Sequence, residues 1–399
     1  MLKLTELGQD IIKDSNRKKI LNILYKNKEV TKQEISKLTG ISIPTVINNI
    51  NLLLEEGLVE EIGVATSTGG RKPIIIRFLS DSRFSFAVEI TPSQVRVIRT
   101  NLNSEIKFDE SFPIKGIHNF DNIMSRISEI VNNHIIENKL SADKILGIGF
   151  SLPGTVDEDK MTMELAPNMK FKNIDFNSYK NNFEFPIYIE NEANAAAFGE
   201  MLLGIGKEMK NLIYISITQG IGTGIVIQDH LYKGKNKRAG EFGHMTIVPN
   251  GKQCNCGRKG CWELYASENI LIDSYNEGSA FQAENMNSQL VSLDQFFAKI
   301  ELHDPRALTI LKEYLYYLSI GLQNIIFGLD PHYIIIGGSL SKFSDYFIEE
   351  LKGLVFDKNN LFDYGDNKLF AAKLKEDASI LGASILPLQT MFFIYDKII

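Results

Sequence analysis

The segment NLIYISITQGIGTGIVI, residues 211–227, carries two runs of apolar residues joined by a glycine-containing turn. Apolar runs rich in isoleucine and bounded by glycine are typical of buried β-strands. The segment therefore predicts two adjacent strands. Its glycines would also allow the backbone at the turn to approach a ligand closely.

Similar strand-to-glycine patterns recur on both sides of this segment. ILGIGFSLPG (145–154) and YIIIGGSL (333–340) enter glycine turns, FSFAVEI (84–90) and QVRVIRTNL (94–102) predict a hairpin, and PIYIEN (186–191) predicts a further strand. A helix is expected over about 120–138, so strands alternate with helices. This alternation predicts an α/β fold whose glycine turns collect at the mouth of a cleft.

The composition is that of a soluble globular protein, with 44% hydrophobic and 23% charged residues among 399. This length predicts two or three domains. Because no apolar run reaches the roughly 18 to 20 residues of a membrane span and the N-terminus lacks a secretory pattern, we expect a cytoplasmic protein. Residues 1–80 carry a formal charge of +3 and the remainder −9, so any contact with nucleic acid is expected in the N-terminal part.

The first eighty residues predict a DNA-binding module. A helix is expected over 16–26. A second helix begins at Thr31, which forms a capping-box pattern with Glu34, and a third spans 42–56. Two short helices joined by a tight turn with a glycine form a helix-turn-helix.

The next segment, LVEEIGVATSTGGRKPIIIRF (58–78), predicts two strands around a glycine-rich tip, which is the wing of a winged helix. The second helix of such a motif enters the major groove with its N-terminal residues. The expected DNA contacts are polar residues of this helix and basic residues of the wing: Ser42, Thr45, Asn48, Asn49, Arg71 and Lys72. The alternative is a module that only mediates protein contacts, because Ile43 and Pro44 stand in place of base-reading cations.

Two polar segments of the larger part carry side chains suited to a sugar. ENEANAAAFGE (190–200) places Asn191 and Glu192 between a strand and an alanine-rich helix, and AGEFGHM (239–245) adds Glu241 and His244. Carboxylates and amides give directional hydrogen bonds to hydroxyl groups, and Glu192 can also serve as a general base. The alternatives are a helix-capping cluster in the first segment and an ordinary surface pair in the second.

The segment CNCGRKGCWE (254–263) holds all three cysteines of the chain, with glycines that let the loop fold back. Structural Zn²⁺ sites take four Cys or His ligands, and the nearest histidine is His244. The spacing therefore predicts a structural Zn²⁺ bound by His244, Cys254, Cys256 and Cys261. Glu263 is the rival fourth ligand, and a redox switch is a further alternative. The metal would place Glu241 and Glu263 beside the imidazole of His244.

Together these motifs resemble the ROK family of repressors, open reading frames and sugar kinases. GEFGHM, CNCGRKGCWE, ENEANAAAFGE, SLPGTVD and TQGIGTG stand in family order, and the winged helix with its GGRKP segment resembles the repressor branch, especially regulators of xylose use. The resemblance implies an actin-like fold of two RNase H-like lobes around a sugar cleft. It implies sugar contacts from Gly154, Asn168, Asn191, Glu192, Glu241, His244 and Glu263. It also matches His244 and the three cysteines to the family's zinc ligands.

Two departures separate the chain from the kinases of this family. The kinases carry an aspartate base where this chain has Glu192, and their actin-like core begins with a phosphate loop resembling DIGGTK. The aligned stretch here is EITPSQV (89–95), which lacks both glycines and contains Pro92. Phosphate loops need glycines so that backbone N–H groups can surround the oxygens. We therefore expect no enzyme activity and no catalytic residue, with Glu192 inactive at the base position.

The sequence predicts a winged helix-turn-helix domain at 1–80, a first actin-like lobe at 81–200, and a second lobe at 201–399 whose C-terminal helix can pack back on the first. The expected function is a repressor of xylose-utilisation genes that a sugar releases from its operator. The expected partners are operator DNA, xylose or another aldose, and further copies of the chain in a dimer or a dimer of dimers, with no membrane. The alternatives are a sugar kinase that uses ATP, and a regulator controlled by a partner protein without a sugar ligand.

Overall fold

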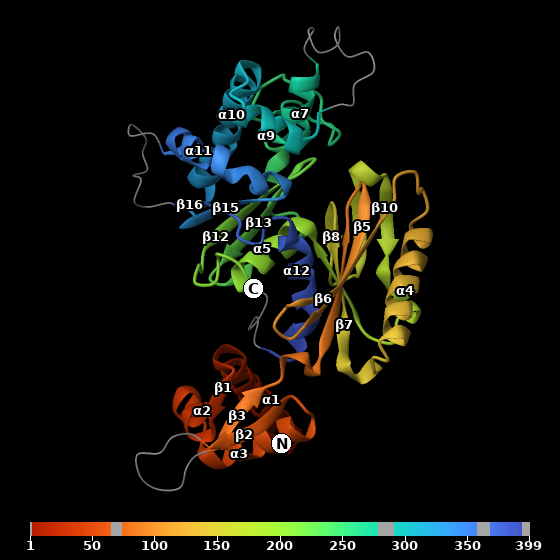
Figure 1. Ribbon diagram of the computed structural model, residues 1–399, viewed down its shortest axis with the longest axis vertical. Helices are drawn as coiled ribbons and strands as arrows, with labels where there is room; N and C mark the ends of the chain where they lie inside the picture. Colours follow the sequence, from red (N-terminus) through yellow and green to blue (C-terminus); the bar gives the residue numbers. More distant parts are fainter. Residues whose placement is uncertain (1, 65–73, 278–290, 357–367, 393–399) are drawn as a thin grey trace.

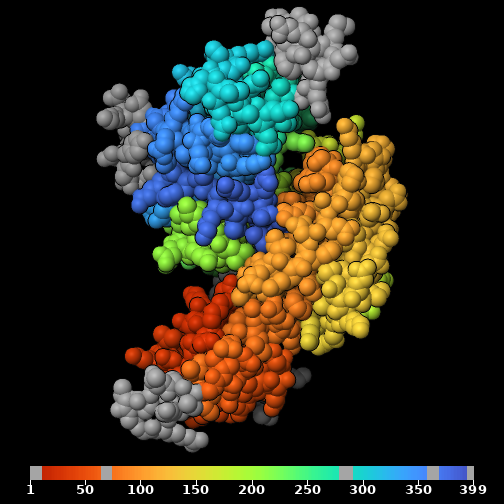
Figure 2. Space-filling model, in the orientation of Figure 1, coloured from red at the N-terminus to blue at the C-terminus, as the bar shows by residue number. Residues whose placement is uncertain are grey.

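The computed structural model describes residues 2–64, 74–277, 291–356 and 368–392. Figure 1 shows three parts along the long axis: a small N-terminal part up to residue 78, hereafter the head, and two larger lobes. The surface is hollowed between the two lobes, where orange residues face blue and cyan ones (Figure 2). Among the described residues, no helix combines the length and apolar character that crossing a membrane requires.

The head is a winged helix-turn-helix, as predicted. It contains α1 (Leu2–Asn27), β1 (Glu29–Thr31), α2 (Lys32–Thr39), α3 (Ile43–Glu55), β2 (Val59–Val64) and β3 (Ile74–Phe78), with the sheet order β1-β3-β2. The capping box between Thr31 and Glu34 is present, and Gly40 ends α2 in the left-handed conformation with φ of 70°. The first helix is longer than predicted, because it begins at Leu2. The tip of the wing, with Arg71 and Lys72, lies outside the described residues.

The first lobe is built on a five-stranded sheet of order β11-β7-β4-β5-β6. Its strands are β4 (Phe84–Ile90), β5 (Gln94–Asn101), β6 (Ile106–Pro113), β7 (Ile145–Leu152) and β11 (Ile187–Asn191). The first three strands are antiparallel, whereas β7 and β11 extend the sheet in parallel from β4. α4 (Phe120–Glu137) buries its apolar face in the same core, and a small sheet of β8 (Thr155–Asp157), β9 (Thr162–Ala166) and β10 (Phe171–Asp175) adds to it.

The second lobe repeats this plan. β12 (Leu212–Ile217) has the antiparallel strands β13 (Ile221–Ile227) and β14 (His230–Leu231) on one side and the parallel strands β15 (Tyr333–Gly337) and β16 (Lys368–Ala371) on the other. Ile217 pairs with Ile221, so the glycine turn of the segment at 211–227 joins β12 to β13 as predicted. The main helices of this lobe are α7 (Glu268–Asn276), α9 (Leu293–Glu301), α10 (Pro305–Leu329) and α11 (Ile348–Val355). Two lobes with one strand plan confirm the predicted fold class.

Two helices lie between the sheets of the lobes (Figure 1). α5 (Glu192–Leu202) packs on β12 and β13, α12 (Ala378–Ile385) packs on β4 and β7, and the two helices pack on each other. Glycines allow these close contacts. A Cβ added at Gly382 of α12 would lie 1.7 Å from the Ala195 carbonyl oxygen of α5, and one at Gly149 of β7 would lie 2.0 Å from the Ala383 carbonyl oxygen of α12. Backbone contact of this kind leaves little room for either helix to shift alone.

Candidate functional site

The three cysteines and His244 converge at one point of the second lobe. His244 ends the 3-10 helix η5 (Glu241–His244), and bridges between Gln253 and Lys259 and between Thr246 and Cys261 close the cysteine loop. The four ligand atoms all lie within 4.8 Å of one another. The residues predicted from their spacing therefore form a cluster that can hold a metal ion.

The spacing within this cluster fits a tetrahedral ion. Cys256 Sγ lies 3.6 Å from Cys261 Sγ, and Cys254 Sγ lies 3.7 Å from His244 Nδ1. Tetrahedral zinc with Zn–S bonds of about 2.3 Å places neighbouring ligand atoms about 3.5 to 3.8 Å apart. Burial would raise the pKa of Cys256, but hydrogen bonds from the Arg258 backbone and the other thiols, with the charge of His244, lower that pKa to about 7. Burial raises the pKa of Cys254 and of Cys261, so the fit to a metal ion rests on the donor set and its spacing.

His244 lies between two carboxylates. Its Nδ1 faces the cysteines and is 3.1 Å from Glu263 Oε1, whereas its Nε2 is 3.9 Å from Glu241 Oε2. Glu263 begins the short helix α6 (Glu263–Ala266) and also touches Cys254 Sγ at 3.2 Å, so the rival ligand contacts the cluster from its side. A Cβ at Gly220 would lie 3.1 Å from Glu263, so the β12–β13 turn leaves just enough room for this carboxylate. The imidazole thus joins the cysteines to a polar wall.

Asn191 caps α5, which is the alternative role considered for its segment. Its Oδ1 accepts hydrogen bonds from the backbone N–H groups of Ala193 and Asn194, and its Nδ2 donates to the Gly154 carbonyl at 2.7 Å. These bonds leave one amide hydrogen of Asn191 for a ligand. Asn168 is exposed on the 3-10 helix η3 (Pro167–Met169), and the contacts that join the other predicted residues do not include it.

Glu192 and Glu89 form a polar cluster where the lobes meet. Glu192 is partly buried and accepts a hydrogen bond from Ser216 Oγ at 2.9 Å, and burial raises its pKa. Burial, and then the charge of Glu192, raise the pKa of Glu89 to about 7. Ser379 of α12 hydrogen-bonds Glu89 and lies 2.5 Å from Ser151 Oγ. Sequence analysis missed Glu89, although an acidic residue near the end of the apolar strand FSFAVEI was a visible signal.

The turn between β4 and β5 holds the stretch that the family resemblance aligns with a phosphate loop, and its hydrogen bonds close it on itself. The Thr91 N–H donates to the Gln94 carbonyl at 2.9 Å, and the Gln94 N–H donates to Thr91 Oγ1 at 3.2 Å. Pro92 has no N–H to donate. Of residues 91–94, Ser93 alone therefore keeps a backbone N–H group that is not used within the turn. A phosphate group needs several converging N–H donors, which this turn does not offer.

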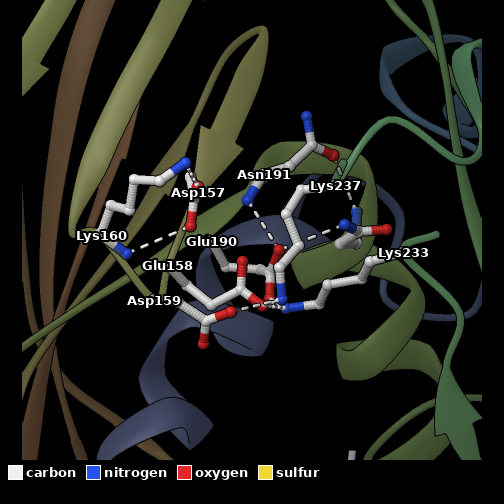
Figure 3. A network of polar contacts seen from close by, with 9 residues as sticks. Asp157, Glu158, Asp159, Lys160, Glu190, Asn191, Lys233 and Lys237 are labelled. Atoms are coloured by element: carbon white, nitrogen blue, oxygen red, sulfur yellow. Dashed lines mark hydrogen bonds and ion pairs between the residues drawn. The ribbon is translucent and has the colours of Figure 1, made fainter. Parts of the chain in front are cut away.

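Two lysines of the second lobe reach across to acidic residues of the first (Figure 3). Lys233 Nζ pairs with Glu158 at 2.8 Å and with Glu190 at 2.5 Å, and Lys237 Nζ pairs with Glu158 at 2.8 Å and with Asp159 at 2.9 Å. The side chains of Lys233 and Glu190 are only 14% and 5% exposed, so water screens their attraction weakly. We call this set the interlobe bridge.

The interlobe bridge adjoins the predicted sugar residues. Glu190 precedes Asn191, and its Oε1 accepts hydrogen bonds from the Asn191 N–H and from Asn194 Nδ2. Sequence analysis missed the bridge, although the acidic run at 157–159 and the basic run at 233–238 carry opposite charges. Their distance in the sequence hid the pairing.

The predicted DNA contacts of α3 line its N-terminal half. Val46, Ile50 and Leu53 bury the opposite face of the helix in the head. Ser42 and Asn48 are exposed, whereas Thr45 and Asn49 are partly buried. Ser42 Oγ lies 2.9 Å from Thr45 Oγ1, and Asn49 Nδ2 donates to the Thr45 carbonyl at 2.8 Å. Of the two asparagines predicted to contact DNA, Asn48 is the more open to solvent.

The head and the two lobes each match a known protein family. The model of the ROK family matches residues 86–390, and a model described as winged helix-turn-helix DNA-binding matches residues 13–60. A protein named xylose repressor from Bacillus spizizenii is 32% identical over 383 residues, which are 96% of this chain and 97% of that protein. A glucokinase from Halalkalibacterium halodurans is 30% identical over 279 residues, which are 67% of this chain and 83% of that protein.

Among solved structures, a ROK family transcriptional regulator described as a homologue of the E. coli MLC protein superposes with a TM-score of 0.80 at 20% identity. The match covers 95% of this chain and 97% of the other. This likeness extends the fold agreement from the lobes to the head. Because the family model spans most of the sequence and the repressor from Bacillus spizizenii aligns over nearly all of it, the chain belongs to the ROK family.

Proposed function

We propose that this chain is a sugar-responsive transcriptional repressor that binds operator DNA as a homodimer and is released by a sugar, with xylose as the first candidate. One observation carries the proposal. A winged helix-turn-helix is joined to a body of sugar-kinase type whose β4–β5 turn uses most of its own N–H donors. The relatives named xylose repressor supply the candidate sugar.

The sugar would lie between the lobes against the polar wall of Glu241, His244 and Glu263, with Glu192 facing it from α5. His244 Nε2 is the ring nitrogen that points away from the cysteines, which supports a role in ligand contact. Asn191 would contribute one amide hydrogen and Gly154 its backbone. Asn168 is the weakest member of the set, because it is exposed and takes no part in the contacts that join the others.

The metal of the cysteine cluster would be Zn²⁺ in a structural role, held by His244 and the three cysteines. The donor set supports this assignment, because zinc prefers thiolate and imidazole ligands and four protein ligands leave no open position for catalysis. Bound zinc would fix the ring of His244 and so the wall beside it. Elemental analysis of the purified chain should find about one zinc per chain, and Cys256→Ser should lose zinc and weaken sugar binding by about tenfold or more. Zinc loss with unchanged sugar affinity would contradict this link.

A sugar kinase is the second candidate, because a named glucokinase is related to the chain and Glu192 is held at the base position. The closed β4–β5 turn argues against it. Purified protein should therefore show no ATP consumption with xylose or glucose. Sustained turnover would replace the repressor proposal with the kinase.

The repressor itself is tested by DNA binding to the chain's own upstream region. The two heads of a dimer would contact half-sites about one or two helical turns apart, and the sugar would favour a state that no longer spaces them correctly. Fluorescence anisotropy should record a fall in DNA affinity on addition of xylose, but not of an unrelated polyol. DNA binding that no sugar changes would reject the inducer and leave control by a partner protein.

A further inference from the structure

The C-terminal segment joins the cleft to the core of the head. It comprises α12 and the 3-10 helix η8 (Leu386–Thr390), followed by Met391 and Phe392. At its N-terminal end, Ser379 contacts Glu89 and Ser151, and Asp377 pairs with Arg96 of β5 at 2.5 Å. The segment therefore begins at the polar cluster where the lobes meet.

The middle of the segment is held against α5. The backbone contact at Gly382 meets Ala195, which lies one turn beyond Glu192, the predicted sugar residue at the start of α5. On its other side, α12 meets β7 of the first lobe. A displacement of α5 when a sugar engages Glu192 would thus be transmitted to α12 by direct contact of main-chain atoms, which cannot yield as side chains do.

The far end of the segment completes the hydrophobic core of the head. Leu388 and Phe392 are 4% and 5% exposed and belong to the same cluster as residues of α1, α2 and α3. The ring of Phe392 lies 5.5 Å from that of Tyr25 and 6.4 Å from that of Phe78. The C-terminal segment is therefore part of the packing of the head.

The head has a second attachment through the chain itself. After β3 the chain enters β4, and here Arg83 Nη2 donates to the Glu56 carbonyl at 3.0 Å, while Lys28 Nζ hydrogen-bonds Asn103 at the β5–β6 turn. The two attachments adjoin, because Leu102 of this turn belongs to the same buried cluster as Leu388 and Phe392. A shift of the C-terminal segment relative to β5 would therefore change the surface on which the head packs and reorient the head.

We propose that α12 and η8 transmit the state of the sugar cleft to the DNA-binding head, with Leu388 and Phe392 as the residues that couple them. This inference rests on the proposed function, because it concerns how that sugar site controls DNA binding. A sugar can reorient the head only by the difference in its affinity for the two arrangements. The coupling then appears as the ratio of DNA affinities without and with sugar.

The test compares Phe392→Leu and Leu388→Ala with the control Phe183→Leu. Phe183 is 7% exposed in the core of the first lobe, away from the segment. DNA affinity is measured by fluorescence anisotropy with and without xylose, and sugar affinity by calorimetry. Both coupling variants should bind sugar as the wild type does, whereas the ratio of DNA affinities should fall about fivefold or more. The control should keep the wild-type ratio.

If xylose lowers the DNA affinity of the wild type and of the coupling variants by the same factor, this inference alone is overturned. A wild type whose DNA affinity no sugar changes overturns the proposed function and this inference with it. If Leu388→Ala does not fold, hydrogen exchange of the wild type decides. Sugar should then change the exchange of amides at 386–392 and in the head, and protection changes confined to the lobes would overturn the coupling.

Discussion

The mouth of the cleft and the C-terminal contact of the head are built from opposite chemistry. The mouth is closed by the interlobe bridge of two lysines and three acidic residues, with the packed pair α5 and α12 behind it, whereas the C-terminal segment is held to the head by buried rings and aliphatic side chains. An ion pair can exchange its partner for water, but separating an apolar contact exposes its whole area. The mouth of the cleft can therefore open at moderate cost, while the head stays packed on the C-terminal segment.

The apolar junction can be broken by one polar residue. Phe392→Gln removes a ring that packs on Tyr25 and Phe78 and buries an amide in its place, so we expect a loss of about 3 to 4 kcal/mol in the stability of the head. Chemical denaturation followed by circular dichroism measures it. The matched control is Leu302→Gln, a residue 75% exposed, which should change stability by less than about 0.5 kcal/mol. Equal stabilities would mean that the head does not depend on this contact.

The interlobe bridge can be broken by Lys233→Met, which keeps the length of the side chain but leaves Glu190 and Glu158 without their shared cation. Because a partly buried carboxylate without its partner is costly, we expect about 2 kcal/mol less stability and about tenfold weaker sugar binding. Calorimetric titration with xylose measures the affinity. The control Lys235→Met changes an exposed lysine of the same loop and should leave affinity unchanged. Unaltered binding in Lys233→Met would show that the bridge does not hold the lobes together.

Glu89 lies in the polar cluster where the lobes meet and where α12 begins, so its substitution tests how this cluster contributes to stability. Its pKa is raised from 4.5 to about 7, so over this range the folded protein keeps a proton that the unfolded chain has lost, and stability falls as pH rises. Glu89→Gln removes the ionisable group and with it this fall in stability. Above pH 7 the variant should therefore be more stable than the wild type by about 1 kcal/mol, with an upper limit of about 3 kcal/mol. Thermal unfolding at several pH values measures it, with exposed Glu137→Gln as control. Parallel pH profiles for wild type and Glu89→Gln would reject the role.

The smallest expected effect is that of salt, which should weaken the interlobe bridge but not the junction of the head. Raising NaCl from about 0.1 to 1 M screens the interlobe bridge and should weaken sugar binding by about two- to threefold. The head–body junction contains buried apolar groups, which high salt does not weaken. Protection of the amides at 386–392 from hydrogen exchange should therefore persist. A loss of protection there at high salt would contradict the contrast between the junctions.

What the sequence could predict was local. The strands around 211–227, the capping box at Thr31 and the convergence of His244 with the cysteines follow from periodicity, cap chemistry and ligand spacing within a few dozen residues. Asn191, Glu192, Glu241 and His244 were indicated by the polar segments that hold them, whereas Gly154 and Asn168 were reached through the family resemblance alone. The amide of Asn191 also caps the first turn of α5, the alternative that the sequence offered for its segment.

What the sequence could not predict depends on contacts between distant segments. Lys233 meets Glu158 only because the two lobes face each other across the cleft, and nothing in the local pattern of either run specifies its partner. Phe392 reads as one more apolar residue near a C-terminal helix, and its place beside Tyr25 follows from the path of the whole chain. Such contacts are consequences of topology, which local propensity does not encode.

The head's shared core also sets an order of events during synthesis. Tyr25 and Phe78 leave the ribosome early, but the ring of Phe392 that packs on both arrives only after both lobes have been made. Until then the head has an unfilled apolar surface, and a chain that stops short of Leu388 never fills it. The core of the DNA-binding module is therefore completed only when the body that follows it has been made.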